Sequence, residues 1–164
     1  MAALTVFAFP DAGEADRALS ALHGMEQRHL LKVNDAATVS WPREAHAPRT
    51  RQSANLQAVG ALDGTFWGML FGFLFAAPFL GAAAGAAIGA LAGRFADFGI
   101  DDHLIARVRS LIEPGNSALF LMAEAGSSEE VAAMLCRAGF APEIVEIPLQ
   151  DDGAMELQRV FGRD

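Results

Sequence analysis

The stretch that decides the fold is residues 64–93, GTFWGMLFGFLFAAPFLGAAAGAAIGALAG, which contains no charged side chain. A continuous helix of this length would be about 45 Å long, whereas the hydrocarbon core of a bilayer is about 30 Å thick. Pro78 lies in the middle, where proline removes a helical hydrogen bond and clashes with the preceding turn. We therefore predict either one kinked span or two helices joined near Pro78, shielded from water by a membrane or by an oligomer core.

Glycine recurs at every fourth position in both halves of this segment. The first arm holds Gly60, Gly64, Gly68 and Gly72, and the second holds Gly81, Gly85, Gly89 and Gly93. A period of four places each set along one ridge of a helix, and a ridge without side chains lets helices approach closely. The pattern predicts a glycine-zipper hairpin over residues 58–94, folded at Pro78, in which the ridges serve packing and oligomerisation.

The two arms differ in the bulk of their side chains. The second arm is mainly alanine and glycine, so it has to pack against other helices to fill space. The first arm has large apolar side chains that we expect to face lipid or a partner: Phe66, Trp67, Leu70, Phe71, Phe73, Leu74 and Phe75. The hairpin is therefore expected to form homo-oligomers with the second arm inward.

Each arm has only about fourteen uncharged residues, fewer than the roughly 20 that usually span a bilayer. Four placements stay open: the hairpin dips into the bilayer from one side, spans a thinned bilayer, fills the middle of a water-soluble assembly, or is buried in the core of a single chain. Asp63 and Arg94 flank the base of the hairpin, where they are expected to pair across its neck.

The flanking sequences alternate between strand and helix patterns. Apolar runs predict buried strands at 4–9 and 117–123, and half-exposed alternation predicts edge strands at 36–41 and 144–149. Helices are expected at 12–31, 101–112, 127–138 and 151–161, with Asp101 and Asp102 capping the second of them. Residues 43–57 are expected to form a loop with, at most, a short strand extension.

Two strand–helix–strand units predict an α+β fold with a ferredoxin-like sheet, in which the two apolar strands are central neighbours. Its domain is expected to comprise residues 1–57 and 95–164, interrupted by the hairpin. A hairpin returns the chain to the same side of a membrane, so both halves of the sheet can pair. Arginines lie on both flanks of the insert, which favours an inner-membrane location with both flanks cytoplasmic.

Composition excludes some function classes. The chain has 164 residues and a net charge of −8, which disfavours nonspecific nucleic-acid binding. The start of the chain has no basic residues before its apolar run, so we expect a strand and not a signal peptide there. The single cysteine, Cys136, excludes an internal disulfide and is expected to be a small core residue.

Several of these motifs, taken in order, resemble those of a known family. They are residues 64–72, Pro78, the run 81–89, residues 97–102 (DFGIDD) and residues 114–120 (PGNSALF). The chain resembles DUF family 1269, bacterial small membrane proteins of unknown function, over nearly its whole length. The resemblance implies membrane association, with some members bearing stress-related names, and it supplies no catalytic residues.

No motif for catalysis, cofactor binding or metal binding is found, so we expect no enzyme and no cofactor. The glycine-rich run lacks the lysine and hydroxyl of a phosphate loop, and the four histidines are scattered. The predicted function is a membrane-associated oligomeric module with a cytoplasmic interaction domain. The alternatives are a water-soluble homo-oligomer with the hairpins as its core, a pore, and a small-ligand-binding regulatory domain.

Overall fold

A computed structural model describes residues 2–28, 33–53, 64–76, 93–124, 126–149 and 159–160. Over this part the protein is a mixed α/β structure with one five-stranded antiparallel sheet. The strands are β1 (Ala2–Phe9), β2 (Asp35–Ser40), β3 (Arg49–Gln52), β4 (Ser117–Glu124) and β5 (Glu143–Pro148). The helices are α1 (Glu14–Gln27), α2 (Gly64–Ala76), α4 (Asp102–Leu111) and α5 (Ser128–Arg137), and residues 93–97 and 159–160 are also helical.

The sheet has the strand order β3-β2-β4-β1-β5. The two apolar strands are central neighbours, as predicted, and pair from Ala2 with Glu124 to Phe9 with Ser117. Both strands are buried on both faces, which explains why their sequences are apolar without alternation. β5 is an outer strand whose exposure alternates, as predicted for an edge.

β2 is not an edge strand, which corrects the prediction. β3 pairs with it, with Ala37 opposite Gln52 and Ser40 opposite Arg49. β3 has the sequence RTRQ and is largely exposed, so it lacks the apolar alternation by which strands are recognised. It is held by its backbone pairing and by an ion pair between Arg51 Nη2 and Asp16 Oδ1, 3.3 Å apart. β3 lies within residues 43–57, which were predicted to form a loop with at most a short strand extension, and it is that extension.

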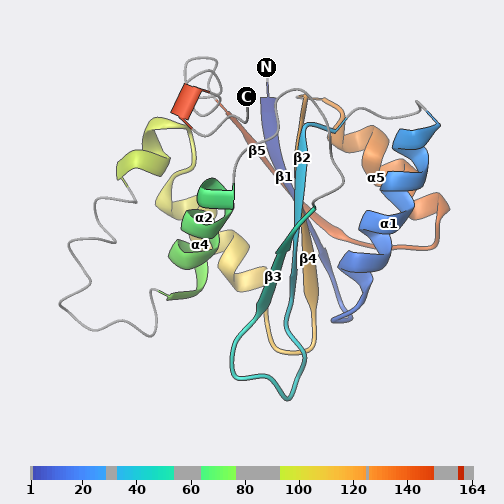
Figure 1. Ribbon diagram of the computed structural model, residues 1–164, viewed down its shortest axis with the longest axis horizontal. Coiled ribbons are helices and arrows are strands. Elements are labelled where there is room, and N and C mark those ends of the chain that lie inside the picture. The colour runs from blue at the N-terminus through green and yellow to red at the C-terminus, as the bar shows by residue number, and fades with distance from the viewer. Residues whose placement is uncertain are drawn as a thin grey trace.

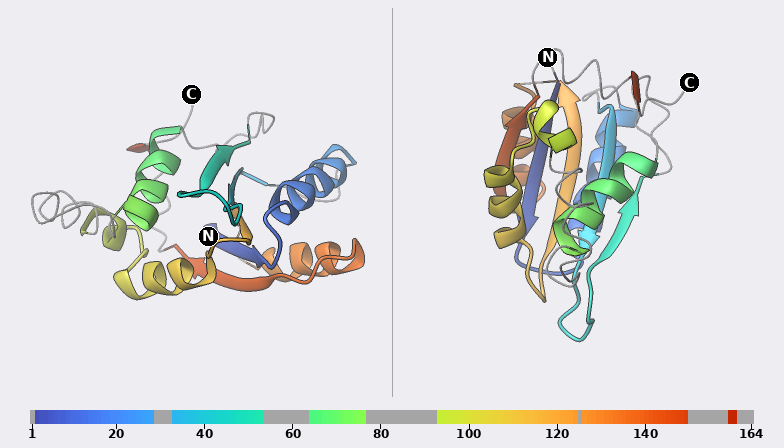
Figure 2. Two further views of the ribbon diagram at one scale, coloured as in Figure 1. Left: turned by 90° about the horizontal axis from the view of Figure 1, so that it is seen from below. Right: turned by 90° about the vertical axis from the view of Figure 1, so that its left-hand side faces the viewer.

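The structure has three layers, with helices on both faces of the sheet (Figures 1 and 2). α1 and α5 cover one face, where their apolar side chains pack with those of Phe7, Leu119 and Leu121. α2 and α4 cover the other, where Val6 and Phe120 belong to the core. The pleat accounts for this division, since successive residues of a strand point to opposite faces.

The helix ends follow the predicted capping in part. Asp101 is the N-cap of α4, and its Oδ1 accepts a hydrogen bond from Leu104 N at 2.8 Å. α1 is shorter than the predicted helix, since it begins at Glu14 and ends at Gln27. The second arm of the hairpin and most of the predicted C-terminal helix lie outside the described residues. Within the segments described, every helix is too short or too polar to cross a bilayer.

Candidate functional site

α2 presents two different faces, and its apolar face is buried against its own sheet. Six of its side chains are at most 6% exposed: Phe66, Trp67, Leu70, Phe71, Phe73 and Leu74. Trp67, Phe71 and Phe75 stack along the helix with centroid separations of 5.8 and 6.5 Å. Phe71 also meets Phe120 of β4 edge to face at 5.2 Å. This face is part of the core of the chain.

This placement corrects the expectation that these side chains face lipid or a partner. The sheet face that α2 and α4 cover is apolar, so without α2 the side chains of this face would lie in water. An uncharged aromatic face is suited both to lipid and to such a sheet, and the sequence does not distinguish the two. Of the seven side chains expected to face lipid or a partner, Phe75 alone is partly buried. Phe75 and Met69 both pack at the rim of the contact between α2 and the sheet.

The opposite face of α2 carries the glycine ridge. Gly68 and Gly72 are exposed, and a Cβ built on either has no described atom within 4 Å. Gly93 is also exposed and open in the same way. Gly64 is the first residue of α2. The remaining predicted packing positions, Gly60, Pro78, Gly81, Gly85 and Gly89, lie outside the described residues.

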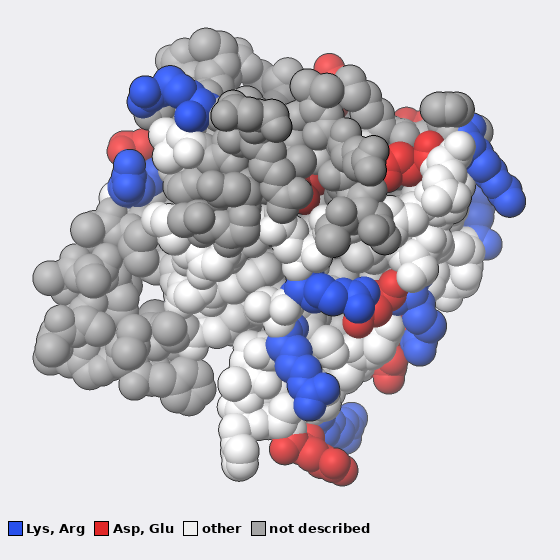
Figure 3. Space-filling view, viewed as in Figure 1, with Lys and Arg blue, Asp and Glu red and all other residues white. Residues whose placement is uncertain are grey.

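The surface over α2 is uncharged where it is described. In the face that Figure 3 shows, Lys, Arg, Asp and Glu gather over α1 and the β2–β3 hairpin, and the described atoms over α2 are uncoloured. This follows from the sequence of α2, which has no charged residue. We name the exposed pair Gly68 and Gly72 the glycine ridge of α2.

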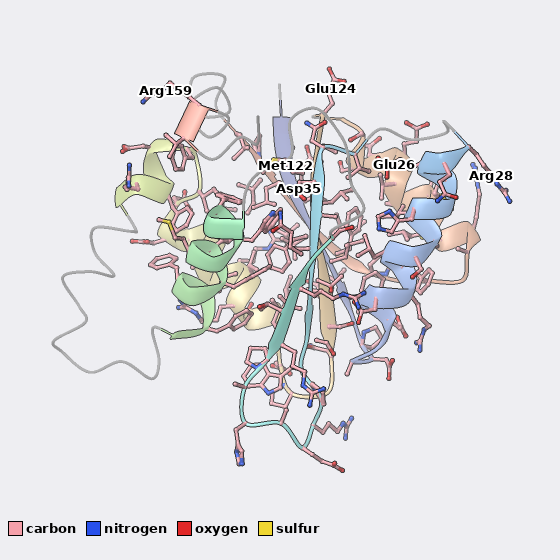
Figure 4. All side chains as sticks on the ribbon, in the orientation of Figure 1. Glu26, Arg28, Asp35, Met122, Glu124 and Arg159 are labelled. Carbon is pink, nitrogen blue, oxygen red and sulfur yellow. The ribbon has the colours of Figure 1, made fainter. Side chains whose placement is uncertain are left out.

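A buried carboxylate anchors α2 to the sheet. Asp35 begins β2, is 1% exposed, and lies opposite Met122 of β4 (Figure 4). Its Oδ2 accepts hydrogen bonds from Trp67 Nε1 at 2.8 Å and from Gln52 Nε2 at 3.2 Å. Its Oδ1 accepts one from Ala36 N at 2.8 Å. One side chain therefore joins β2, β3 and α2 beneath the surface.

A guanidinium holds the C-terminal end of α2. Arg109 of α4 donates from Nε to the carbonyl oxygen of Leu74 at 2.8 Å and from Nη2 to that of Phe73 at 3.1 Å. The last carbonyls of a helix have no partner within the helix, and a cation there is favoured by the helix dipole. Arg109 thus fixes the end of α2 just before Pro78.

We expect Arg109→Ala to lower the free energy of unfolding by about 2 kcal/mol, because it removes two charge-assisted hydrogen bonds at a half-buried helix end. Urea unfolding of the full chain measures it. Arg107→Ala, on the exposed side of the same helix, is the matched control and should change the free energy by less than about 0.5 kcal/mol. Equal losses in the two variants would contradict the assignment.

The predicted neck pair stays a prediction. Arg94 is exposed on the short helix of residues 93–97, and Asp63 lies outside the described residues. Neither Asp35 nor Arg109 was singled out from the sequence. An Asp at the start of an apolar strand was a usable signal for a buried partner, but nothing in the sequence indicates that the partner is Trp67.

A hydroxyl, an imidazole and a carboxylate meet between α1 and the end of β3. His23 Nε2 lies 3.0 Å from Ser53 Oγ, and His23 Nδ1 lies 3.7 Å from Glu26 Oε2. This is the order of a nucleophilic triad. The last distance exceeds a hydrogen bond, however, and Ser53 is only 6% exposed, so its hydroxyl lies beneath the surface. The pocket beside His23 is small and mostly apolar. We assign this group to tying β3 to α1.

Other candidate chemistry is sparse in the described part of the chain. It contains no group of three or more His, Cys, Asp or Glu placed to hold a metal ion. Cys136 is exposed, which corrects the expectation of a core residue. The buried stripe of α5 comprises Ser128, Val131 and Leu135, and Cys136 follows that stripe by one residue, outside it.

Comparison with known proteins gives one result. The model of a family described as "Protein of unknown function (DUF1269)" matches residues 61–162, from the region of α2 to beyond β5. The match begins after β3, so it covers less of the chain than the resemblance in the sequence suggested. No curated protein and no solved structure matches the chain. Because the matched residues are well over half of the 164, the chain belongs to the DUF1269 family of proteins of unknown function.

Proposed function

We propose that this protein is a non-enzymatic, self-assembling module that associates with a membrane through its glycine-rich apolar insert. The sheet and its helices would form a cytoplasmic interaction domain at an inner membrane, with a role linked to stress. The partners in this proposal are further copies of the chain and the lipid bilayer. It requires no cofactor and no nucleic acid.

The observation that carries the proposal is the orientation of α2. Its aromatic face is buried on the sheet, and its glycine ridge is turned outward, with no described atom within 4 Å of a Cβ built on either glycine. Glycine costs a helix about 0.5–1 kcal/mol relative to alanine, so two exposed glycines four residues apart are unfavourable unless they serve a contact. The contact that glycine allows and larger residues prevent is close approach of a second helix.

The second arm has the sequence to supply that helix. Gly81, Gly85, Gly89 and Gly93 repeat with the same period, and alanine fills most of the positions between them. In our proposal the second arm of another copy packs on the glycine ridge of α2. The assembled arms form the oligomer core.

We further propose that the sheet is ferredoxin-like, with β3 as an added outer strand. The order β2-β4-β1-β5 supports this, because α1 connects β1 to β2 and α5 connects β4 to β5, each pair with one strand between. α2 and the residues up to α4 are inserted between β3 and β4. The glycine-rich hairpin in this insertion remains part of the proposal.

A second candidate is a water-soluble homo-oligomer with the inserts at its centre. The burial of the aromatic face of α2 favours it, since these side chains are removed from water without lipid. The two candidates share the glycine ridge as the helix-packing surface. They differ in what covers the remaining apolar sequence of the insert.

Fractionation of the expressed full chain tests both candidates. The main proposal predicts that the protein stays in membranes washed with carbonate and is an oligomer in detergent. An oligomer that is recovered without detergent supports the second candidate. A monomer recovered without detergent contradicts both, and light scattering coupled to size exclusion measures the mass in each case.

A further inference from the structure

The burial of α2 leaves one property of the helix weakly determined, which is its rotation about its own axis. No residue of α2 is charged. Partly buried Met69 and Phe75 pack against the core beside the fully buried side chains. At 100° per residue they lie at opposite edges of the buried arc. Turning the helix in one direction would bury Met69, and turning it in the other would bury Phe75. Each turn would expose an aromatic side chain that now lies in the core. Apolar burial therefore holds α2 to the sheet, but discriminates poorly between rotations.

The Trp67–Asp35 hydrogen bond does discriminate between rotations. Trp67 is 2% exposed and Asp35 1% exposed, so neither polar group has ready access to water if the bond is broken. The indole has a single donor, and the 2.8 Å bond to Oδ2 requires it to point at β2. A rotation of α2 that removes the indole leaves a buried donor and a buried carboxylate with one partner fewer, and such losses are strongly unfavourable.

The carboxylate is itself held by two further donors, one from β3 and one from its own strand. Gln52 of β3 donates to Oδ2, and the Ala36 amide donates to Oδ1. These two hydrogen bonds do not involve α2, so they hold Asp35 independently of the position of that helix. Arg109 contacts backbone carbonyls at the far end of α2, so it fixes where the helix ends. Only the Trp67 contact joins a side chain of α2 to a directional polar acceptor on the sheet among the hydrogen bonds described for this helix.

We propose that Asp35 is a positioning residue that sets the rotation of α2 through Trp67, and that this rotation turns the glycine ridge outward for a second helix. In some coiled coils a buried polar residue specifies the register of the packed helices in this way, at a cost in stability. The second half of the statement rests on the proposed function. The first half concerns the single chain and is tested without any assembly.

Thiol labelling of the full-length monomer tests the rotation. Cys136→Ser removes the natural thiol, and single cysteines are placed at Gly72 on the ridge and at Phe73 at the buried edge. In this background Gly72→Cys should react with a maleimide at least about tenfold faster than Phe73→Cys. Replacing both polar partners, with Asp35→Leu and Trp67→Phe, should reduce that ratio by about tenfold, because the energetic preference for one rotation is lost.

The double replacement separates rotation from stability. Removing both partners of a buried polar pair leaves fewer unpaired groups than removing one, so the double variant should unfold at a higher urea concentration than Asp35→Leu alone. If Asp35 only stabilised the fold, the double variant would regain both its stability to urea and the labelling ratio of the parent protein. An unchanged ratio in the double variant overturns the inference. The assembly proposal fails separately, if blocking the glycine ridge leaves the oligomer intact.

Discussion

Phe71→Ala is expected to lower the free energy of unfolding by about 3–5 kcal/mol. Phe71 is 6% exposed and packs between Trp67 and Phe75 of its own helix while meeting Phe120 of β4 edge to face. Truncation removes the ring contact between the middle of α2 and β4 and leaves a cavity there. Few single substitutions in the described part of the chain should cost more.

The same experiment distinguishes a sheet-bound α2 from a lipid-facing one. Urea unfolding in the absence of detergent and lipid measures the loss, and Gly72→Ala is the control on the adjacent, outward position. Alanine at Gly72 meets no described atom and should raise stability by about 0.5–1 kcal/mol. A loss below about 1 kcal/mol for Phe71→Ala would mean that its ring is not packed in the core.

The central part of the sheet was predictable from the sequence because its physical signals are local. β1 and β4 are apolar without interruption, since both faces are covered, and continuous apolar runs are typical of such strands. Asp101 was predicted as a cap from its position before an amphipathic stripe, and the cap forms. In each case a few neighbouring residues contain all the information.

The placement of α2 was not predictable, because it depends on contacts across the chain. A helix with aromatic side chains and no charge loses water equally well against lipid, a partner or its own sheet. The residues that commit it to the sheet are Asp35, 32 positions before Trp67, and Arg109, 35 positions after Leu74. Neither separation leaves a periodic trace in the sequence.

β3 could not be predicted reliably either, because its pairing also depends on residues distant in the sequence. Its polar sequence suits a loop, and it becomes a strand because β2 offers a free edge and Asp16 of α1 an ion-pair partner. Charged side chains on an outer strand also oppose pairing with other chains. The polarity that hid β3 from sequence reasoning is thus consistent with its position at the border of the sheet.

The double substitution Gly68→Leu and Gly72→Leu is expected to weaken self-association by about 100-fold or more. Two leucines on the glycine ridge would hold a second helix away from the α2 backbone, so the close contact that the proposal requires cannot form. The single chain should be stabilised at the same time, by about 0.5–1 kcal/mol per site, because leucine favours the helix and a Cβ at either position has no described atom within 4 Å.

These opposite signs make the result specific to the glycine ridge. Gly24 is the matched control, since it is an exposed glycine inside α1 and a Cβ built on it also has no described atom within 4 Å. Gly24→Leu should stabilise the chain by a similar amount and leave the association constant unchanged, which also accounts for any effect of an added surface leucine. Sedimentation over a range of concentrations measures association, and urea unfolding of the monomer measures stability. If the double variant gains stability and associates as the parent does, the glycine ridge is not the contact between helices, and the proposed assembly has to use another surface.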